Sequence, residues 1–295
     1  MSSSPELHAG GRSLKALFSV GILLPPTMFI FSFFIVPLAY LFYGSFKTNS
    51  QSELFGSSFT FENYTTILTD PFYLLIIERT ILMSCIVLGL SLLLGYPTAM
   101  VISRMGSRGR LIMLGLLTLP LMVSNVVRAY GWVIILGRTG VINGTLQDAG
   151  LIERPLSLLY GIESVMLGFL TVLLPYIVIT ISNTLVATEK VYGEAAQSLG
   201  AGPIRSFLYV TWPLSSPGVA AGLMLSLFLM LSAYVTIALL GGPRYKLLVS
   251  MIVDSVGAFQ WPTAAALSFI LLTIACLGGL LIQLLIRPQR VKGAR

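Results

Sequence analysis

The side chains that most often carry chemistry are scarce in this chain. The one histidine, His8, lies in a polar N-terminal segment, and the two cysteines, Cys85 and Cys276, lie inside apolar runs without the spacing of metal ligands. A histidine-dependent nucleophile inside those runs has no imidazole to use. We expect no catalytic residue, no metal site and no cofactor in this chain, and two buried cysteines that act as small hydrophobic residues.

One wet stretch interrupts the apolar runs. "EAAQSLGAGPIRSFLYVTWPLSSPG" begins at Glu194 and combines a carboxylate and an arginine with several glycines and prolines. Its residue types predict a short helix over 190–199, ended by Gly200 in the left-handed conformation. Pro203 suits the first turn of a second short helix over 203–210. The pattern therefore predicts a helix, a turn and a helix that lie across a membrane surface.

The apolar runs on both sides of this stretch are expected to be membrane helices. Hydrophobic residues make up 56% of the 295 residues and charged residues only 10%, which excludes an ordinary soluble domain. Backbone groups in lipid must be bonded within their own segment, so each apolar run is expected to be a helix. The six expected spans are Leu17–Phe42, Leu74–Val101, Leu111–Leu136, Glu163–Leu185, Leu214–Leu240 and Thr263–Ile286.

The placement of Lys and Arg predicts the orientation. The net charge of +7 gathers at the ends of the apolar runs, which indicates membrane lipid rather than nucleic acid as the surrounding partner. The short basic turn "RMGSRGR" is expected on the cytoplasmic side, so both termini are cytoplasmic. The expected organisation is a tail over 1–14, a six-helix all-α membrane domain over 15–287 with a cytoplasmic loop over 187–213, and a tail over 288–295.

Polar side chains within the spans have two possible roles. Thr80, Ser84, Ser91 and Thr98 share one helix face. Such groups either hydrogen-bond within the helix bundle or line a cavity. Arg128 falls near the outer edge of its span, where its side chain could reach the interface or orient an outer gate. The candidates for a polar path or outer gate are Arg128, Tyr130, Trp132, Tyr176, Ser232, Tyr234, Thr236 and Asp254.

The wet stretch closely resembles the EAA loop of ABC importer permease subunits. In that family EAA is followed by three residues, a glycine, nine residues, and a hydrophobic-x-hydrophobic-Pro ending. The matching positions are Glu194, Ala195, Ala196, Gly200, Val210 and Pro213. Trp212 stands where the family usually has leucine. "VVRAYGWVIILGRTGVIN" (126–143) and "AYVTIALLGGP" (233–243) further resemble the spermidine/putrescine branch.

The resemblance implies a function and a set of partners. It implies a permease subunit of a multi-pass bacterial inner-membrane importer, with alternating access driven by an ABC ATPase dimer that docks on the first short helix. No G-x-x-x-x-G-K-[ST] sequence occurs here, so ATP and its magnesium would bind to that partner. A second permease chain, usually a different one, and an external solute-binding protein complete the set.

The residues of this chain are compatible with more than one class of cargo. The branch favours a polyamine, but polyamine permeases of this branch often carry an acid where this chain has Ala233. An opine, an amino-acid derivative or an aminophosphonate is therefore an alternative cargo. A passive channel or membrane scaffold is a more remote alternative, and copurification with an ATPase would separate it from an importer.

Overall fold

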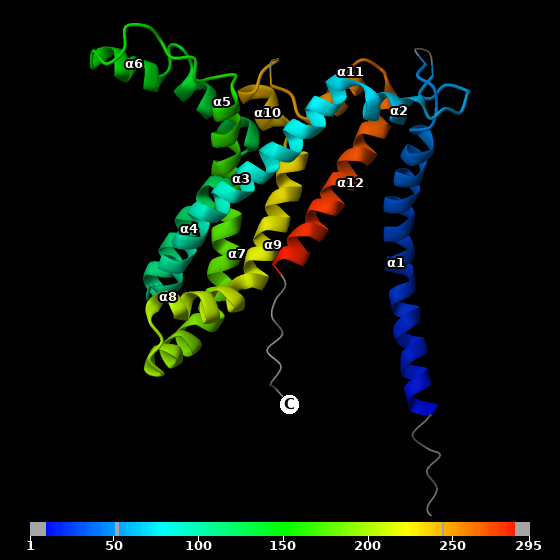
Figure 1. Cartoon of the computed structure of the whole chain (residues 1–295). Helices are drawn as coiled ribbons and strands as arrows, with labels where there is room; N and C mark the ends of the chain where they lie inside the picture. Colours follow the sequence, from blue (N-terminus) through cyan, green and yellow to red (C-terminus); the bar gives the residue numbers. More distant parts are fainter. Residues whose placement is uncertain (1–9, 51–52, 244, 287–295) are drawn as a thin grey trace, which may run out of the picture. The chain divides into compact units, whose positions relative to one another are not determined.

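The computed structural model describes residues 10–50, 53–243 and 245–286, and most of these residues are helical (Figure 1). They form two compact units, one from the described residues of Met1–Thr66 with Ser255–Ala266, and one from those of Ile67–Asp254 with Leu267–Arg295. The helices are α1 (Gly10–Gly44), α2 (Glu62–Thr69), α3 (Pro71–Arg104), α4 (Ser107–Met122), α5 (Asn125–Leu136), α6 (Val141–Asp148), α7 (Ile162–Ser198), α8 (Pro203–Ser206), the π-helical η2 (Phe207–Thr211), α9 (Trp212–Ser232), α10 (Tyr234–Leu240), α11 (Leu248–Gly257) and α12 (Trp261–Leu285).

The first unit is held together by a buried asparagine. The side-chain amide of Asn63, on α2, donates to the carbonyls of Ser45 and Lys47 at 2.9 and 2.8 Å, just beyond the end of α1. The Asn63 carbonyl accepts from the hydroxyl of Thr263, at the start of α12, at 3.3 Å. Thr263 in turn accepts from the Asn49 amide at 2.9 Å. These bonds satisfy backbone groups that the end of α1 leaves unpaired.

The second unit is built around α7, which packs along both α3 and α9. Phe169, Leu173, Ile177, Ile181 and Leu185 recur every four residues on one face of α7 and are fully buried. Two glycines of α9 allow close approach to that helix. A β-carbon at Gly218 would lie 2.2 Å from the Thr184 hydroxyl oxygen, and one at Gly222 would lie 2.7 Å from that of Thr180.

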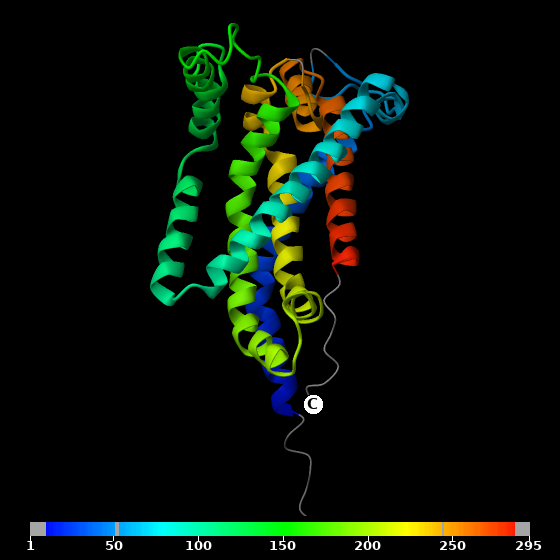
Figure 2. The ribbon, with the colours of Figure 1, turned by 60° about the vertical axis from the view of Figure 1, so that its left-hand side comes forward.

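Five described helices are long and apolar enough to span a membrane, and a bent pair makes a sixth. The expected third span, Leu111–Leu136, is not one helix. The chain breaks at Val123 and Ser124, both with extended backbone, and Ser107–Met122 lies at 91° to Asn125–Asp148 (Figure 2). Pro120, in the last turn of α4, favours an end there because its ring disrupts helical bonding.

The expected fifth span is also broken. Helix α9 ends at Ser232, and Ala233 adopts φ −84° and ψ 70° before α10 begins at Tyr234. Nothing in the residue types around Ala233 indicates this break. Three of the other expected spans fall within α1, α3 and α7, and the last, Thr263–Ile286, lies within α12 except that it ends one residue later.

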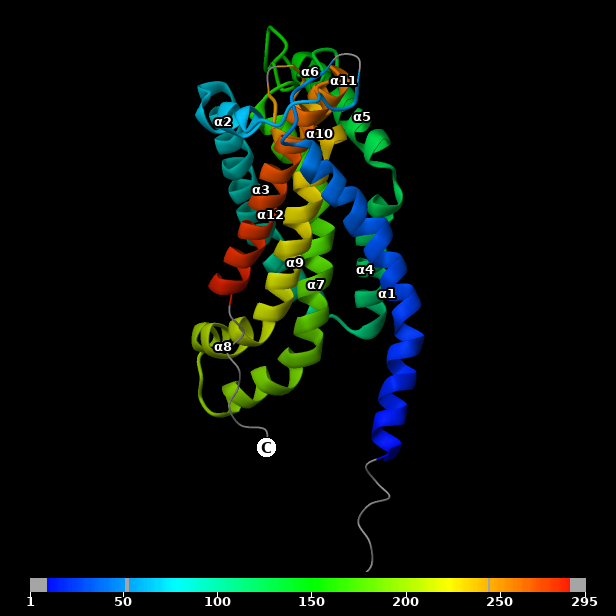
Figure 3. The ribbon, with the colours of Figure 1, turned by 90° about the vertical axis from the view of Figure 1, so that its right-hand side faces the viewer.

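The wet stretch has the expected turn but not two separate helices. Helix α7 continues to Ser198, and α8 and η2 continue into α9 without a gap. The turn itself is a helix-ending motif. Gly200 has φ +82°, and the N–H of Ala201 donates to the Ala196 carbonyl at 3.1 Å. Pro203 lies in the first turn of α8, as expected. Figure 3 shows the end of α7 turned aside and α8 lying crosswise to α9.

The expectation for the cysteines is wrong. Cys85 on α3 and Cys276 on α12 are both free and exposed. Both helices have apolar surfaces that are not covered within the chain, and an apolar run alone does not say which side of a helix is covered.

Candidate functional site

Arg128 lies at the break between α4 and α5. Its guanidinium donates to the carbonyl of Pro120 and, at 3.0 Å, to that of Val123. The Asn125 side-chain oxygen lies 3.5 Å away. The Pro120 carbonyl also accepts the N–H of Val123 at 3.3 Å, and both carbonyls lie at the C-terminal end of α4, where a cation is favoured. Arg128 therefore caps α4 and holds the break.

The two aromatic residues that follow Arg128, Tyr130 and Trp132, have different surroundings. The indole N–H of Trp132 donates to the Thr171 hydroxyl on α7 at 3.2 Å. The side chain of Tyr130 is 52% exposed and lies away from this contact. The RxYxW spacing therefore places one aromatic residue inside the unit and one on its surface.

The second break brings α10 against α5 and α7. Thr236 is buried beside Gly168 of α7, where a β-carbon would lie 2.9 Å from the threonine methyl group. Ala233, at the break itself, packs with Trp132 on the same apolar cluster. Both broken spans thus meet on α7, an arrangement found around binding sites in transporters with discontinuous helices.

Three candidates have other surroundings. Ser232 is exposed, and its hydroxyl donates to the Phe228 and Leu229 carbonyls of its own helix, both at 3.0 Å. Tyr234 and Tyr176 are both partly buried. Tyr176 lies five residues beyond Thr171 along α7, about 7.5 Å along the helix axis.

Asp254 is already paired. Its carboxylate oxygen lies 2.5 Å from the Lys246 ammonium, with side chains 42% and 38% exposed respectively. Nearby in sequence, the guanidinium of Arg79 lies 5.6 Å from the centre of the Tyr245 ring. Burial raises the pKa of Tyr245 while the Arg79 charge lowers it, and the phenol stays neutral at pH 7. This carboxylate and this aromatic face therefore each hold a cation of the same chain.

Thr80 proves to be a link between helices. Its buried hydroxyl donates to the Ile76 carbonyl at 2.7 Å and accepts from the N–H of Leu248, the first residue of α11, at 3.0 Å. Thr98, at the exposed end of the same helix face, bonds only to the Leu94 carbonyl at 2.8 Å. The shared face predicted polar contacts, but the partner on α11 could not be read from spacing.

The EAA residues fall at one end of the unit. Ala195 is exposed, Ala196 is partly buried at the end of α7, and Gly200 forms the turn. Val210 lies in η2 and Pro213 in the first turn of α9, both partly buried. Glu194 belongs to α7, but its side chain lies outside the described residues.

Sequence reasoning missed the apolar surface around these residues. Leu199 is 89% exposed, Ile204 74% and Tyr209 78%. Helix signals alone do not show which side of the stretch the unit covers. Three large, exposed apolar side chains beside a turn form a surface of the kind that a partner protein covers.

Sequence reasoning also missed the role of Trp212. Its ring lies 5.4 Å from that of Tyr96 on α3, and the Phe207 ring lies 5.6 Å from that of Tyr96. The Tyr96 and Ser215 hydroxyl oxygens lie 2.7 Å apart. The departure from leucine at Trp212 is thus matched by an aromatic partner on another helix.

The described residues contain no group of three or more His, Cys, Asp or Glu side chains that could hold a metal ion. Around the two helix breaks, Arg128, Trp132 and Thr171 use their hydrogen-bonding groups within the chain, and Thr236 is buried. These contacts fix the two breaks in place.

Known proteins resemble this chain over most of its length. The family model described as "Binding-protein-dependent transport system inner membrane component" matches residues 91–290. The spermidine/putrescine transport system permease protein PotB of Escherichia coli K12 is 29% identical over 248 residues, covering 84% of this chain and 89% of that protein. PotB of Haemophilus influenzae is 31% identical over 238 residues, covering 80% and 82%.

A solved structure shares the fold. A bacterial alginate ABC transporter, in complex with an alginate pentasaccharide-bound periplasmic protein, aligns with a TM-score of 0.73. The alignment covers 97% of this chain and 99% of that chain at 21% identity. At this identity the likeness concerns the arrangement of helices.

Proposed function

Because the chain belongs to the family of binding-protein-dependent transport system inner membrane components, we propose that it is the membrane-spanning permease subunit of an ATP-driven importer for a small polycationic solute such as a polyamine. The resemblance seen in the sequence motifs is confirmed at the level of the family. The chain is a multi-pass inner-membrane protein. The choice of a polyamine as cargo rests on similarity to two spermidine/putrescine permeases, which match 84% and 80% of this chain.

The end that carries the EAA residues is the cytoplasmic end in this proposal. The placement of Lys and Arg favours cytoplasmic termini and a cytoplasmic stretch over 187–213. There the exposed side chains of Leu199, Ile204 and Tyr209 provide an apolar surface, beside small alanines that permit close approach. This surface is the proposed contact for an ABC ATPase subunit, with Glu194 as its charged residue.

ATP and magnesium belong to the partner in this scheme. An ATPase dimer offers two equivalent contacts and this chain has one EAA loop, so a second permease subunit is required. A different chain is preferred for that place. A solute-binding protein delivers the cargo from outside. The membrane domain covers 15–287, between terminal tails over 1–14 and 288–295.

The cargo path is proposed to pass the two helix breaks. An ammonium group is attracted to aromatic faces, and Tyr130, Trp132, Tyr176 and Tyr234 lie on the helices around the breaks. Ser232 and Thr236 supply hydroxyl groups at the second break. Asp254 already holds Lys246, so a cation would have to displace that lysine to use its carboxylate. Aromatic faces are therefore the main cation-binding groups in this path.

Uptake of labelled solutes tests the cargo. Cells that carry the whole transporter, with or without this chain, are given putrescine, spermidine, an opine and aminoethylphosphonate. Uptake of a polyamine that depends on the chain is expected. Uptake of only a non-polyamine would overturn the polyamine assignment while leaving an importer. It would direct attention to Arg128, the cation at the first break.

The substitution Glu194→Lys tests the contact with the ATPase. The residue lies outside the apolar span, so membrane insertion should survive while docking of the ATPase and transport fail. Glu53→Lys, an equal change of charge in the exposed segment between α1 and α2, is the matched control. Normal transport by the Glu194→Lys variant would show that the coupling assignment is wrong.

A further inference from the structure

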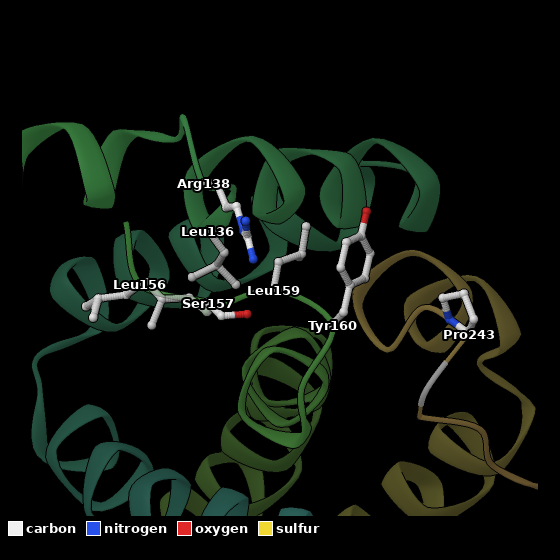
Figure 4. A pocket seen from close by; sticks show the side chains of 8 residues that line it. Leu136, Arg138, Leu156, Ser157, Leu159, Tyr160 and Pro243 are labelled. Carbon is white, nitrogen blue, oxygen red and sulfur yellow. The ribbon is translucent and has the colours of Figure 1, made fainter. Parts of the chain in front are cut away.

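A cavity of about 570 Å³ opens where the end of α5, the segment 156–160 and the turn after α10 meet (Figure 4). Its walls are the leucine side chains of 136, 156, 158 and 159, and Tyr160 and Pro243 close one side. Its polar groups are the Arg138 guanidinium and the hydroxyls of Ser157 and Tyr160. In Figure 4 the Arg138 guanidinium extends toward Leu136 and Leu159, with the Ser157 hydroxyl on the same side of Tyr160.

Asn143 fixes two walls of this cavity. It is fully buried on α6, and its amide donates to the Gly137 carbonyl at 2.9 Å and to the Leu156 carbonyl at 3.0 Å. Its carbonyl accepts from the N–H of Leu156 at 2.7 Å. One side chain thus satisfies three backbone groups and holds the residue before Arg138 beside the residue before Ser157.

Tyr160 fixes a third wall. It has φ +66°, a conformation that a residue with a bulky side chain rarely adopts, and its N–H donates to the Leu240 carbonyl at 3.0 Å. Its ring lies on Gly242, where a β-carbon would come within 2.6 Å of a ring carbon. Backbone strain of this kind persists only where the surroundings enforce it, so the cavity is a preorganised feature of the fold.

The chemistry of the cavity selects a carboxylate. Within the described residues no hydrogen bond or ion pair joins Arg138 to another side chain or to a carbonyl. The Arg138 side chain is exposed and therefore accessible to a carboxylate of another protein, which a guanidinium binds through two parallel N–H donors. Ser157 offers one more hydroxyl donor.

The position of the cavity selects the partner. Figure 1 shows α5 and α10 at the end of the second unit opposite to α8, so in the proposed orientation the cavity faces the outside. The structural relative above was solved with its periplasmic protein bound. We propose that this cavity receives an aspartate or glutamate side chain from the surface of the solute-binding protein. This inference rests on the proposed importer function.

The same contact would link docking to both helix breaks. Arg138 follows α5, which begins at the first break, and Pro243 follows α10, which begins at the second. An acidic side chain held between these walls therefore favours one relative position of α5 and α10. Only a binding protein that prefers one arrangement of the two helices can shift their equilibrium.

Charge reversal tests the proposal. The complete transporter, with its ATPase and second permease, is reconstituted in nanodiscs, and the dissociation constant of its solute-binding protein is measured over a range of salt concentrations. Arg138→Glu is expected to weaken docking by roughly tenfold or more. Arg154→Glu, an equal change on an exposed residue of the same segment outside the cavity, should change it less than about twofold. One acid-to-arginine substitution on the binding protein should restore docking to the Arg138→Glu variant.

The outcomes are distinct. Unchanged docking of Arg138→Glu, or equal weakening by both variants, would overturn the cavity as the acceptor. Should Arg138→Glu fail to assemble, Ser157→Trp fills the cavity without changing charge, and normal docking of that variant would also overturn it. If the unsubstituted transporter binds no solute-binding protein, the proposed importer function itself fails.

Discussion

The hydroxyl oxygens of Tyr96 and Ser215 lie 2.7 Å apart in a buried contact between α3 and the first turns of α9. Phe207, the first residue of η2, and Trp212, the first residue of α9, both pack their rings against Tyr96. The π-helical turn is a less regular and less stable form of helix, and such turns often occur at functional sites. A displacement of α8 would therefore reach α3 through Tyr96 as well as α9 through the backbone.

Removing one hydroxyl group tests this contact. Tyr96→Phe keeps the ring and leaves Ser215 with only its bond to the Trp212 carbonyl. We expect a loss of about 1 kcal/mol in stability, because a buried hydrogen bond disappears. A double-mutant cycle with Ser215→Ala, followed by thermal unfolding in detergent, measures the coupling. Tyr209→Phe, on a ring that is 78% exposed, is the control, and equal effects of the two tyrosine substitutions would contradict the contact.

Arg128 should not tolerate replacement by lysine. The Nη2 nitrogen of the guanidinium donates to both the Pro120 and the Val123 carbonyls, and Nη1 lies 3.5 Å from the Asn125 side-chain oxygen, whereas a lysine ammonium on a flexible stem does not hold this planar arrangement. We expect Arg128→Lys to lose about 1–3 kcal/mol of stability and to broaden the distance between spin labels placed on α4 and α5. Arg108→Lys, on an exposed arginine of α4, is the control. An unchanged distance distribution in Arg128→Lys would show that the break holds without the cap.

The glycines of α9 give a steric prediction. An alanine at Gly218 would place its β-carbon 2.2 Å from the Thr184 hydroxyl oxygen and 3.0 Å from the Thr180 carbonyl oxygen. Gly218→Ala should therefore separate α7 from α9 and lower stability by about 1–3 kcal/mol. Gly115→Ala, on α4, meets no atom within 4 Å and should be neutral or slightly stabilising. Thermal unfolding of the two variants compares them directly, and equal midpoints would refute the close packing.

Thr80 should matter more than Thr98, although both lie on α3. Thr80→Val removes the acceptor for the buried N–H of Leu248, which should destabilise the start of α11 by about 1–3 kcal/mol. Thr98→Val removes only a bond to its own helix and should have little effect. Hydrogen exchange at Leu248 measures the difference. Equal protection of that amide in both variants would exclude the link.

The exposed apolar surface near the EAA residues gives a functional prediction. Leu199 is 89% exposed, so Leu199→Asp should leave folding intact while it weakens binding of the ATPase by about tenfold or more. Leu151→Asp, on a side chain that is 71% exposed in the segment after α6, should leave that binding unchanged. Copurification of the ATPase with each variant measures the effect. Full retention by Leu199→Asp would place the contact elsewhere.

Features that depend on neighbours in the chain could be predicted. The left-handed turn at Gly200 and the position of Pro203 follow from local backbone preferences, and both were expected. The break at Ala233 and the exposure of the two cysteines were not expected. They depend on which helix faces which, and the spacing of residues within one helix does not contain that information.

The sequence by itself determined the approximate places of the apolar spans, because in hydrocarbon a backbone must satisfy its own hydrogen bonds and an apolar run of sufficient length forms a helix. Its EAA motif also determined the family. Only the tertiary structure decided where a span is interrupted and which polar side chains meet. An interrupted helix leaves carbonyls that need a partner, and Arg128 supplies it at the first break. Asn143, on α6, does the same for the Gly137 and Leu156 carbonyls in the walls of the cavity beside Arg138, and helical spacing does not encode these contacts.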